Sequence, residues 1–351
     1  MALDAQALEI LMLYEKILVV QTAFIGDSVL TLPLIQSLSS LFPSSLIDVI
    51  SAPASEEIFK ASPFVHKVIV YDKRGADKSL ISIFHFAGRI RNEKYSVIYS
   101  PHRSLRTAML VKLSGVKETY GFSNSSLSRL YRNVIPYHGR LHEVQRNLSL
   151  TGCYKEGDEW KIKPEIQSDE KTVRKIDGIL YGYEGRKFAT VAPGSVWETK
   201  KYPVERYKGI VEFLLGRGIK VFLIGAKSDR ALCDELSAGH AGDVVNVAGN
   251  LTITESVELL RRCSVLICND SAPAHFGMAA GIAVLTIYCS TVPDFGFYPY
   301  NEKSRIMNFD ELKCKPCGIH GHKKCPVKSF DCAYKISESE VNDIIAEMLD
   351  D

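Results

Sequence analysis

The sequence predicts an α/β protein with two halves, each built on a sheet of parallel strands. Short runs of apolar and β-branched residues recur along the chain, and segments of helix length separate them. The same alternation restarts after residue 187. With 351 residues, the chain is long enough for two domains of ordinary size, each with a core of its own.

Strands are predicted in the first half at residues 16–20, 46–50, 68–71 and 97–99. The first is followed by a glycine-containing turn and then by apolar residues at helical spacing between Val29 and Leu41. In the second half, strands are predicted at residues 189–192, 220–224, 265–268 and 284–288. Because the stretch between the halves is charged and weakly patterned, we place a linker at 160–180. The domains are then residues 1–170 and 171–351, with a cleft between them.

Composition points to a globular protein. Hydrophobic residues make up 46% and charged residues 24% of the chain, which is ordinary for soluble domains. No apolar run reaches the roughly 18 residues of a membrane-spanning helix. The apolar stretch at residues 7–14 is broken by Glu9 and lacks a basic start, so we predict no signal peptide. The dispersed cysteines favour reduced thiols or metal ligands, and we expect a cytoplasmic protein.

The formal net charge of +2 hides a basic region. Between Arg89 and Arg146, 11 lysines and arginines stand against 3 acidic residues, so the rest of the chain is net negative. Such a region suits an anionic partner. A solvated basic surface without a partner is the alternative.

Loops that follow strands are the first places to look for a site, because open parallel sheets bind ligands at the carboxyl ends of their strands. The loop after the first strand contains Gly26, Asp27 and Ser28. Asp27 has the chemistry to accept a proton from a substrate hydroxyl. The alternative is that Asp27 or Ser28 caps the following helix.

The loop after the first strand of the second half suits a phosphate. Gly194 allows close approach of the backbone, Ser195 and Thr199 offer hydroxyls, and Lys200 or Lys201 supplies a cation. The spacing of a P-loop is absent. A plain surface loop is the alternative.

A third loop, within residues 268–280, leads from a strand into a helix of small residues. The N–H groups of Ser271 and Ala272 would open this helix and form an anion site, which the helix dipole reinforces. As alternatives, Asp270 is the N-cap of the helix and His275 is a packed histidine.

Together these loops resemble the ADP-heptose:lipopolysaccharide heptosyltransferases of glycosyltransferase family 9, particularly the heptosyltransferase II type. The motifs are Gly26-Asp27, the Pro-Gly-Ser-Val-Trp-Glu-Thr-Lys-Lys-Tyr-Pro run at 193–203, and the Asn-Asp-Ser-Ala-Pro-Ala-His run at 269–275. Segments 102–106 and 142–147 and the final cysteine segment add support. The resemblance covers residues 16–345.

This resemblance implies a GT-B type fold, with two Rossmann-like domains that face an interdomain cleft. The first domain would bind the acceptor and the second the ADP-sugar. It also implies an inverting transfer of heptose from ADP-L-glycero-D-manno-heptose to the inner core of lipopolysaccharide, without a catalytic metal or other cofactor. Asp27 resembles the family's general base and Lys200 the lysine that contacts the diphosphate. The donor-site loop corresponds to Asp270, Ser271 and His275.

Ala272 stands where many family members have glycine, and it would be strained if the phosphate contact required a positive φ. Asp229 follows the second strand of the second half and is predicted to accept hydrogen bonds from the ribose hydroxyls, with a surface turn as the alternative. The absence of a Gly-x-Gly-x-x-Gly motif argues against a nicotinamide cofactor.

An inner-core acceptor, either lipid A with Kdo or an already heptosylated core, is anionic and lies at the inner membrane surface. The basic region is therefore assigned to this acceptor, and the enzyme is expected to associate peripherally with that membrane. We predict acceptor contacts from Gly26, His102, Arg103, Arg106 and Arg146. Arg103 and Arg106 share a face if residues 104–113 are helical, and ordinary salt bridges are the alternative.

Four cysteines, Cys314, Cys317, Cys325 and Cys332, crowd the segment 314–332. Their spacing is compatible with a structural zinc ion, although the second pair lacks a tight knuckle. Disulfides and free thiols are the alternatives, and no catalytic role is inferred.

Three other functions compete with this interpretation. A GT-B transferase could use another nucleotide-sugar, and a two-lobed solute-binding protein would share the architecture. A zinc-ribbon module that binds nucleic acid is disfavoured by the modest net charge, so no nucleic-acid partner is predicted.

Overall fold

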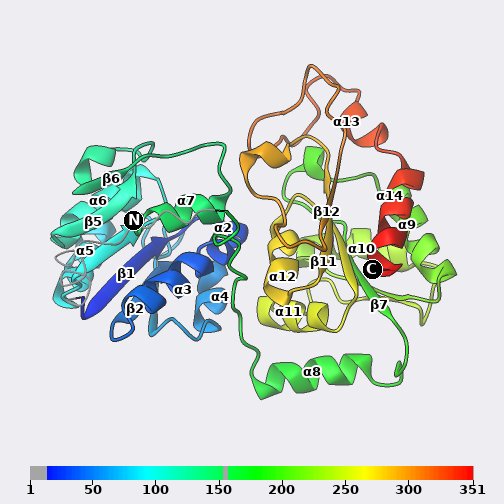
Figure 1. The fold of residues 1–351 in the computed structure, drawn as a ribbon, viewed down its shortest axis with the longest axis horizontal. Coiled ribbons are helices and arrows are strands. Elements are labelled where there is room, and N and C mark those ends of the chain that lie inside the picture. The colour runs from blue at the N-terminus through cyan, green and yellow to red at the C-terminus, as the bar shows by residue number, and fades with distance from the viewer. Residues whose placement is uncertain (1–13, 153–156, 351) are drawn as a thin grey trace. The chain divides into compact units, whose positions relative to one another are not determined.

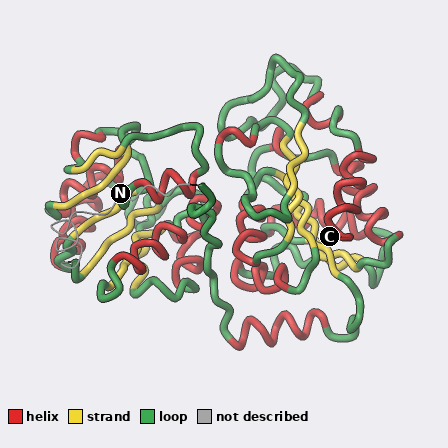
Figure 2. Tube along the Cα trace, viewed as in Figure 1, coloured by secondary structure: helices red, strands yellow, loops and turns green. Residues whose placement is uncertain are grey.

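The computed structural model describes residues 14–152 and 157–350 (Figures 1 and 2). The chain forms two compact units, Met1–Gln167 and Ser168–Asp351, and the change between them falls inside the predicted linker. Most of the apolar stretch considered as a leader, residues 7–13, lies outside the described residues. In the described part of the chain, no helix has the length and apolar character needed to cross a membrane.

The first unit is built on a six-stranded parallel sheet in the order β3-β2-β1-β4-β5-β6. Its strands are β1 (Lys16–Gln21), β2 (Leu46–Ser51), β3 (Lys67–Val70), β4 (Val97–Ser100), β5 (Glu118–Phe122) and β6 (Asn133–Ile135). Its helices are α2 (Ile25–Val29), α3 (Leu32–Leu41), α4 (Glu56–Lys60), α5 (Leu80–Asn92), α6 (Leu105–Ser114) and α7 (Glu143–Ser149), with short turns η1 (Pro53–Ser55) and η2 (Ser128–Leu130). The four predicted strands are confirmed.

The helix predicted after β1 is in fact two helices, α2 and α3. The chain turns at Leu30 and Thr31, and Pro33 lies in the first turn of α3, where its missing N–H group costs nothing. The Thr31 hydroxyl donates to the carbonyl of Asp27 (2.8 Å) and accepts from the Gln21 amide (2.9 Å). These contacts hold the short helix α2 against the carboxyl end of β1.

The second unit has its own six-stranded parallel sheet, in the order β12-β11-β10-β7-β8-β9. Its strands are β7 (Phe188–Ala192), β8 (Lys220–Leu223), β9 (Val244–Asn246), β10 (Val265–Asn269), β11 (Ala283–Tyr288) and β12 (Arg305–Asn308). Its helices are α8 (Glu170–Leu180), α9 (Val204–Gly216), α10 (Arg230–Ser237), α11 (Ile253–Arg261), α12 (Ala272–Ala280), α13 (Asp331–Tyr334) and α14 (Glu338–Asp350), with turns η3 (Glu198–Lys200), η4 (Lys227–Asp229) and η5 (Pro293–Phe295).

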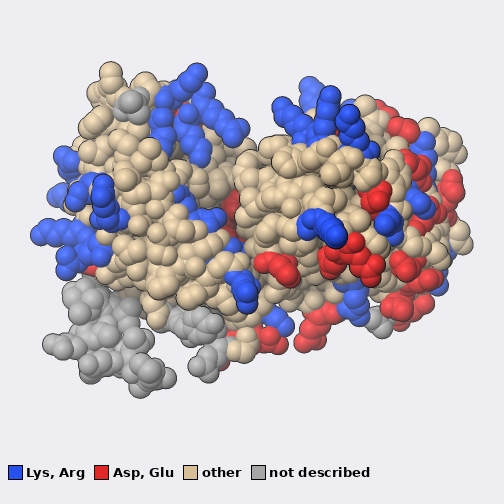
Figure 3. Space-filling view, turned by 90° about the horizontal axis from the view of Figure 1, so that it is seen from above, with Lys and Arg blue, Asp and Glu red and all other residues tan. Residues whose placement is uncertain are grey.

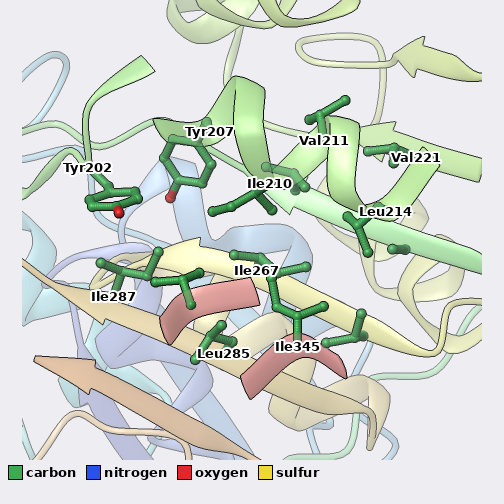
Figure 4. Close-up of a cluster of buried hydrophobic side chains, with 14 of the residues drawn as sticks. Tyr202, Tyr207, Ile210, Val211, Leu214, Val221, Ile267, Leu285, Ile287 and Ile345 are labelled. Carbon is green, nitrogen blue, oxygen red and sulfur yellow. The ribbon is translucent and has the colours of Figure 1, made fainter. Parts of the chain in front are cut away.

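Burial accounts for part of the strand prediction, although the edge strand β3 was predicted and the interior strand β5 was missed. The predicted strands β10 and β11 are buried along their whole length, as expected for central parallel strands covered on both faces. Figure 4 shows this core, in which Ile267 lies opposite Ile210 of α9, and Leu285 belongs to the same cluster. The edge strands β6, β9 and β12 are shorter or half-exposed, so their apolar pattern is weaker.

Helix α8 was missed because it lies in the charged stretch assigned to the linker. It begins after Asp169, whose carboxylate accepts the N–H group of Thr172 (2.8 Å) and caps the helix. Ile176 is buried in the second unit, whereas most other α8 side chains are exposed or half-exposed. One narrow apolar stripe is enough for a helix on the surface of a sheet domain.

Candidate active site

The loops after β7 and β10 lie together because these two strands are neighbours in the sheet. Asn269, at the end of β10, joins the loops. Its amide nitrogen donates to the carbonyl of Pro193 (2.7 Å), while its oxygen accepts from the N–H of Tyr202 (2.9 Å) and the hydroxyl of Tyr207 (3.0 Å). Both tyrosines are labelled in Figure 4. One fully buried amide therefore fixes the frame of the predicted donor site.

Within this frame, Lys200 pairs with Asp270. Its Nζ lies 2.6 Å from the Asp270 carboxylate, and the two side chains are only 13% and 12% exposed. The same carboxylate oxygen accepts the hydroxyl of Thr291 (2.7 Å). The neighbouring Lys201 instead pairs with Glu198, which is largely exposed. Of the two lysines, Lys200 is thus the one held beside the start of α12.

The start of α12 is open. Ser271 is its N-cap residue, so the alternative that Asp270 caps this helix is wrong. The Ser271 side chain makes no capping hydrogen bond, Pro273 has no N–H group, and the N–H of Ala274 donates to the carbonyl of Ser271 (3.1 Å), so the N–H groups of Ser271 and Ala272 are the ones that can face a ligand. Ala272 is the first helical residue, and the non-glycine residues with positive φ in the described chain lie elsewhere. The strain considered for Ala272 is therefore absent, and the helix end is free to bind an anion.

His275 is buried one turn into α12. Burial lowers its pKa to about 4, with the positive charge of Lys200 acting in the same direction and Asp270 opposing it. The imidazole is therefore neutral near pH 7. Its Nδ1 lacks a hydrogen-bond partner among the described residues, which is rare for a buried polar atom. A neutral, partnerless nitrogen beside an open helix end suits a polar ligand.

Gly194 and Asp229 are brought together from the loops after β7 and β8. A Cβ atom on Gly194 would lie 2.3 Å from Cγ of Asp229, so only glycine allows this approach. The Asp229 carboxylate accepts the N–H group of Ala226 (2.9 Å) and stays half-exposed. Ser195, also half-exposed, belongs to the same loop. The position of Asp229 agrees with the predicted donor site and also with a local turn.

Thr199 has a different role from the one predicted. Its backbone N–H donates to the carbonyl of His322 (3.1 Å), and its hydroxyl accepts the N–H of His322 (2.7 Å) and the hydroxyl of Ser290 (3.0 Å). The side chain is buried. Thr199 therefore anchors the cysteine-rich segment to the loop and does not offer a free hydroxyl to a donor.

The predicted zinc site is not supported. In the ranges that the structure describes, no three His, Cys, Asp or Glu side chains are placed to hold a metal ion, and every cysteine is a free thiol. Cys332 is buried in the core of the second unit, whereas Cys314 is exposed. Packing of the core decides which of these cysteines are buried, and the spacing of the cysteines in the sequence does not reveal that packing.

In the first unit, Asp27 is the third residue of α2 and is half-exposed. Its carboxylate accepts the N–H group of Phe24 (3.3 Å), so it supports the start of the helix as the capping alternative requires. Gly26 is also half-exposed, whereas Ser28 is buried and donates to the carbonyl of Phe24 (3.1 Å). The Asp27 carboxylate therefore combines a role at the start of the helix with partial exposure.

His102 lies behind this loop. Its Nδ1 is within hydrogen-bond distance of the hydroxyls of Thr22 (3.0 Å) and Thr107 (2.6 Å). Burial lowers its pKa to about 3, and the charges of Lys73 and Arg103 lower it further. Lys73, which the sequence did not single out, donates to the carbonyl of Thr22 (2.6 Å), and burial lowers its pKa. It adds a cation to this edge of the sheet.

The predicted acceptor arginines differ in their contacts. The guanidinium group of Arg106 donates to the Tyr71 hydroxyl (2.6 Å) and to the carbonyls of Lys78 (2.9 Å) and Ser79 (2.8 Å). Arg106 therefore holds the loop before α5 in place, which differs from the predicted acceptor contact. Arg103 is half-buried and lies over the ring of Tyr137, 4.4 Å from its centroid.

Arg146 is buried in an ion pair with Glu143, which differs from the predicted acceptor contact. Its Nε lies 3.1 Å from the carboxylate, and both side chains are at most 3% exposed. Burial raises the pKa of Glu143 to about 7, against the effect of Arg146 and with a further contribution from Asp27. Sequence reasoning missed Glu143, although its spacing of three from Arg146 on α7 indicates a pair. A buried carboxyl thus lies near the predicted base.

Comparison with known proteins identifies the family to which the chain belongs. Residues 83–328 match the family model described as glycosyltransferase family 9 (heptosyltransferase). The chain belongs to glycosyltransferase family 9. It is similar to lipooligosaccharide heptosyltransferase 2 of Haemophilus ducreyi, with 25% identity over 80% of this chain and 85% of the relative.

Two solved structures share the fold of this family 9 enzyme. One is E. coli ADP-heptose lps heptosyltransferase II (TM-score 0.78, 19% identity, 95% of this chain and 98% of the other). The second is the E. coli heptosyltransferase WaaC with ADP-2-deoxy-2-fluoro heptose (TM-score 0.69, 18% identity, 95% and 99%). The predicted GT-B type of fold, with two α/β units that each contain a sheet of parallel strands, is confirmed.

The close approach of Gly194 and Asp229 predicts that Gly194→Ala destabilises the protein. The added methyl group must displace the carboxylate, and overpacking of this kind costs about 1 to 3 kcal/mol of unfolding free energy. Gly216→Ala, on α9 with open space around it, is the matched control and should be neutral or stabilising. Urea unfolding of both variants measures the difference. Equal effects would contradict the proposed contact.

The raised pKa of Glu143 predicts that the stability of the protein depends on pH. Its pKa is about 7 in the folded chain, above the value of 4.5 for an unperturbed carboxyl, so the folded state binds the extra proton between these values. Wild-type stability relative to Glu143→Gln should therefore fall by about 1 to 3 kcal/mol as pH rises from about 5 to about 8. Unfolding curves at both pH values test this. A difference that does not change with pH would refute the raised pKa.

Proposed function

We propose that this enzyme transfers heptose from ADP-heptose to the inner core of lipopolysaccharide. The observation that carries the proposal is the cluster of Lys200, Asp270, the open start of α12 and His275 in a chain of family 9. The names of its relatives support the sugar and the acceptor class, since they include lipooligosaccharide and lipopolysaccharide heptosyltransferases.

The second unit would bind the donor. The diphosphate would lie at the start of α12, where free N–H groups and the helix dipole favour negative charge. Lys200 would contact the same group, with Asp270 fixing its position. When the bond between the anomeric carbon and the diphosphate oxygen breaks, the electron pair leaves with ADP. The lysine and the helix end would stabilise that charge more strongly than the charge of the bound donor.

The first unit would bind the acceptor and supply the base. The Asp27 carboxylate would take the proton of the acceptor hydroxyl as its oxygen bonds to the anomeric carbon, which inverts the configuration there. The negative charge that Glu143 gains near pH 7 would make the nearby Asp27 a stronger base. Arg103 and Lys73 supply positive charge at this edge for an anionic acceptor.

Product analysis tests the proposed function directly. The purified enzyme is incubated with ADP-heptose and with core acceptors that carry no heptose or one heptose, and the products are identified by mass spectrometry. Addition of one heptose to one of these acceptors is expected. Parallel reactions with GDP-mannose and UDP-sugars test other donors. Transfer from one of these alone would replace ADP-heptose in the proposal.

Asp27→Asn should lower kcat roughly 10²- to 10⁴-fold, the usual contribution of a positioned base. The amide oxygen can still accept the N–H group of Phe24, so the start of α2 is preserved. Binding of ADP, measured by thermal stabilisation, should be unchanged. Glu56→Gln, which removes a half-exposed carboxylate of α4 that pairs with Lys60, is the control and should retain normal turnover. Near-normal turnover of Asp27→Asn would remove the base assignment.

Lys200→Ala should weaken ADP binding roughly ten-fold or more, because a charge-assisted contact to phosphate is lost. The matched control is Lys201→Ala, which removes a neighbouring lysine from a surface pair and should leave ADP binding within about two-fold.

Lys200→Ala also leaves Asp270 buried without its cation, so the variant is expected to be less stable. Lys200→Ala/Asp270→Asn separates the two effects. It should recover stability without recovering ADP binding, measured by calorimetry. Equal ADP affinity of the Lys200 and Lys201 variants would contradict the donor-site assignment.

A further inference from the structure

The outer side of α5 takes no part in the chemistry proposed above. This helix packs Ile83 and Phe86 into the core of the first unit. Ile81 and Phe84 project from its other side, where they are 68% and 58% exposed. Residues three apart lie on one face of a helix, so these two apolar side chains are neighbours near the start of α5. Solvent exposure of two such large side chains together calls for an explanation.

Basic residues border this apolar pair. Arg74 and Lys78 lie in the exposed loop before α5, and Arg89 is exposed further along the helix. Residues 73–91 contain 5 lysines and arginines but only one acidic residue. On the face visible in Figure 3, the first unit carries many basic and few acidic groups, whereas the second unit carries both. We call Arg74, Lys78, Ile81, Phe84 and Arg89 the α5 surface.

The start of the α5 surface, with Arg74, Lys78 and Ile81, lies at the same edge of the sheet as Asp27. The loop before α5 leaves the carboxyl end of β3, a neighbour of β2 in the sheet, and Asp27 follows the carboxyl end of β1. Lys73 ties this loop to the residue after β1 by donating to the carbonyl of Thr22 (2.6 Å). Arg106 fixes the start of α5 through the carbonyl of Ser79 (2.8 Å). The surface is therefore rigidly connected to the edge where the acceptor is proposed to bind.

We propose that the α5 surface docks the enzyme onto an anionic phospholipid bilayer. Ile81 and Phe84 enter the boundary between headgroups and acyl chains, and the basic residues contact lipid phosphates. Two apolar side chains are too few for a stable protein interface, which buries roughly 800 Å² on each partner. This inference rests on the proposed function, because a lipid-linked acceptor is presented at such a bilayer.

Co-sedimentation of the full chain with vesicles tests the docking. Vesicles of phosphatidylcholine alone are compared with vesicles that also contain phosphatidylglycerol. Wild-type protein should bind only the anionic vesicles, and salt should weaken this binding. Ile81→Ser/Phe84→Ser should lower the partition coefficient roughly ten-fold or more, since two apolar contacts with the bilayer are lost. Arg74→Ser/Lys78→Ser should lower it several-fold.

The matched control is Leu46→Ser. Leu46 is 42% exposed and begins β2, so it lies at the opposite edge of the same sheet. This variant should bind vesicles as the wild type does. Because Ile81 and Phe84 are outside the proposed transfer chemistry, their variant should also retain normal turnover on a soluble, deacylated acceptor. Thermal unfolding confirms that each variant is folded.

The outcomes separate docking from the proposed function. Absence of wild-type binding to anionic vesicles, or unchanged binding of Ile81→Ser/Phe84→Ser, would overturn the docking. If the wild type forms a dimer but binds no vesicles, and only the Ile81→Ser/Phe84→Ser variant fails to dimerise, the surface would be assigned to a second copy of the chain. That result would also overturn the docking proposal. Vesicle binding that depends on both apolar residues, in an enzyme that transfers no heptose, would support docking while the proposed function fails.

Discussion

Parallel pairing of β7 with β10 is the constraint on which the proposed donor site depends. Parallel neighbours end at the same edge of a sheet, so the loops that follow them meet although about 75 residues separate them in the chain. Asn269 converts this proximity into a fixed geometry, because it is the last residue of β10 and its side-chain amide bonds to both ends of the loop after β7. Lys200 and Asp270 stand on either side of that junction and can therefore pair.

The two units use buried charge in different ways. In the second unit, the Lys200–Asp270 pair retains slight exposure. It is accompanied by an open helix end and by an imidazole nitrogen that has no partner in the described part of the chain. Such a pair can exchange contacts with a ligand. In the first unit, Glu143 and Arg146 are almost completely buried. Removing either would leave an uncompensated charge in the interior, so this pair is suited to fixing the surroundings of Asp27 and to changing its basicity.

Sequence patterns predicted the central strands and the loops after them because these features are local. The apolar runs of β1, β2, β10 and β11 are buried on both faces, and each loop follows directly from its strand. Prediction was weaker where a role depends on distant contacts. The predicted donor residue Thr199 is an anchor for His322, and the predicted acceptor residue Arg106 is an anchor for the loop before α5. Neither partner is a neighbour in sequence.

By itself, the sequence determined the alternation of strands and helices, the order of the loops and the chemical groups that each loop carries. Apolar periodicity and short motifs contain that information within a few residues. Only the tertiary structure decided which charges are buried, which are paired and which helix end is left open. Burial and pairing depend on residues that the sheet order brings together, as Lys200 and Asp270 show, and a linear pattern does not specify that order.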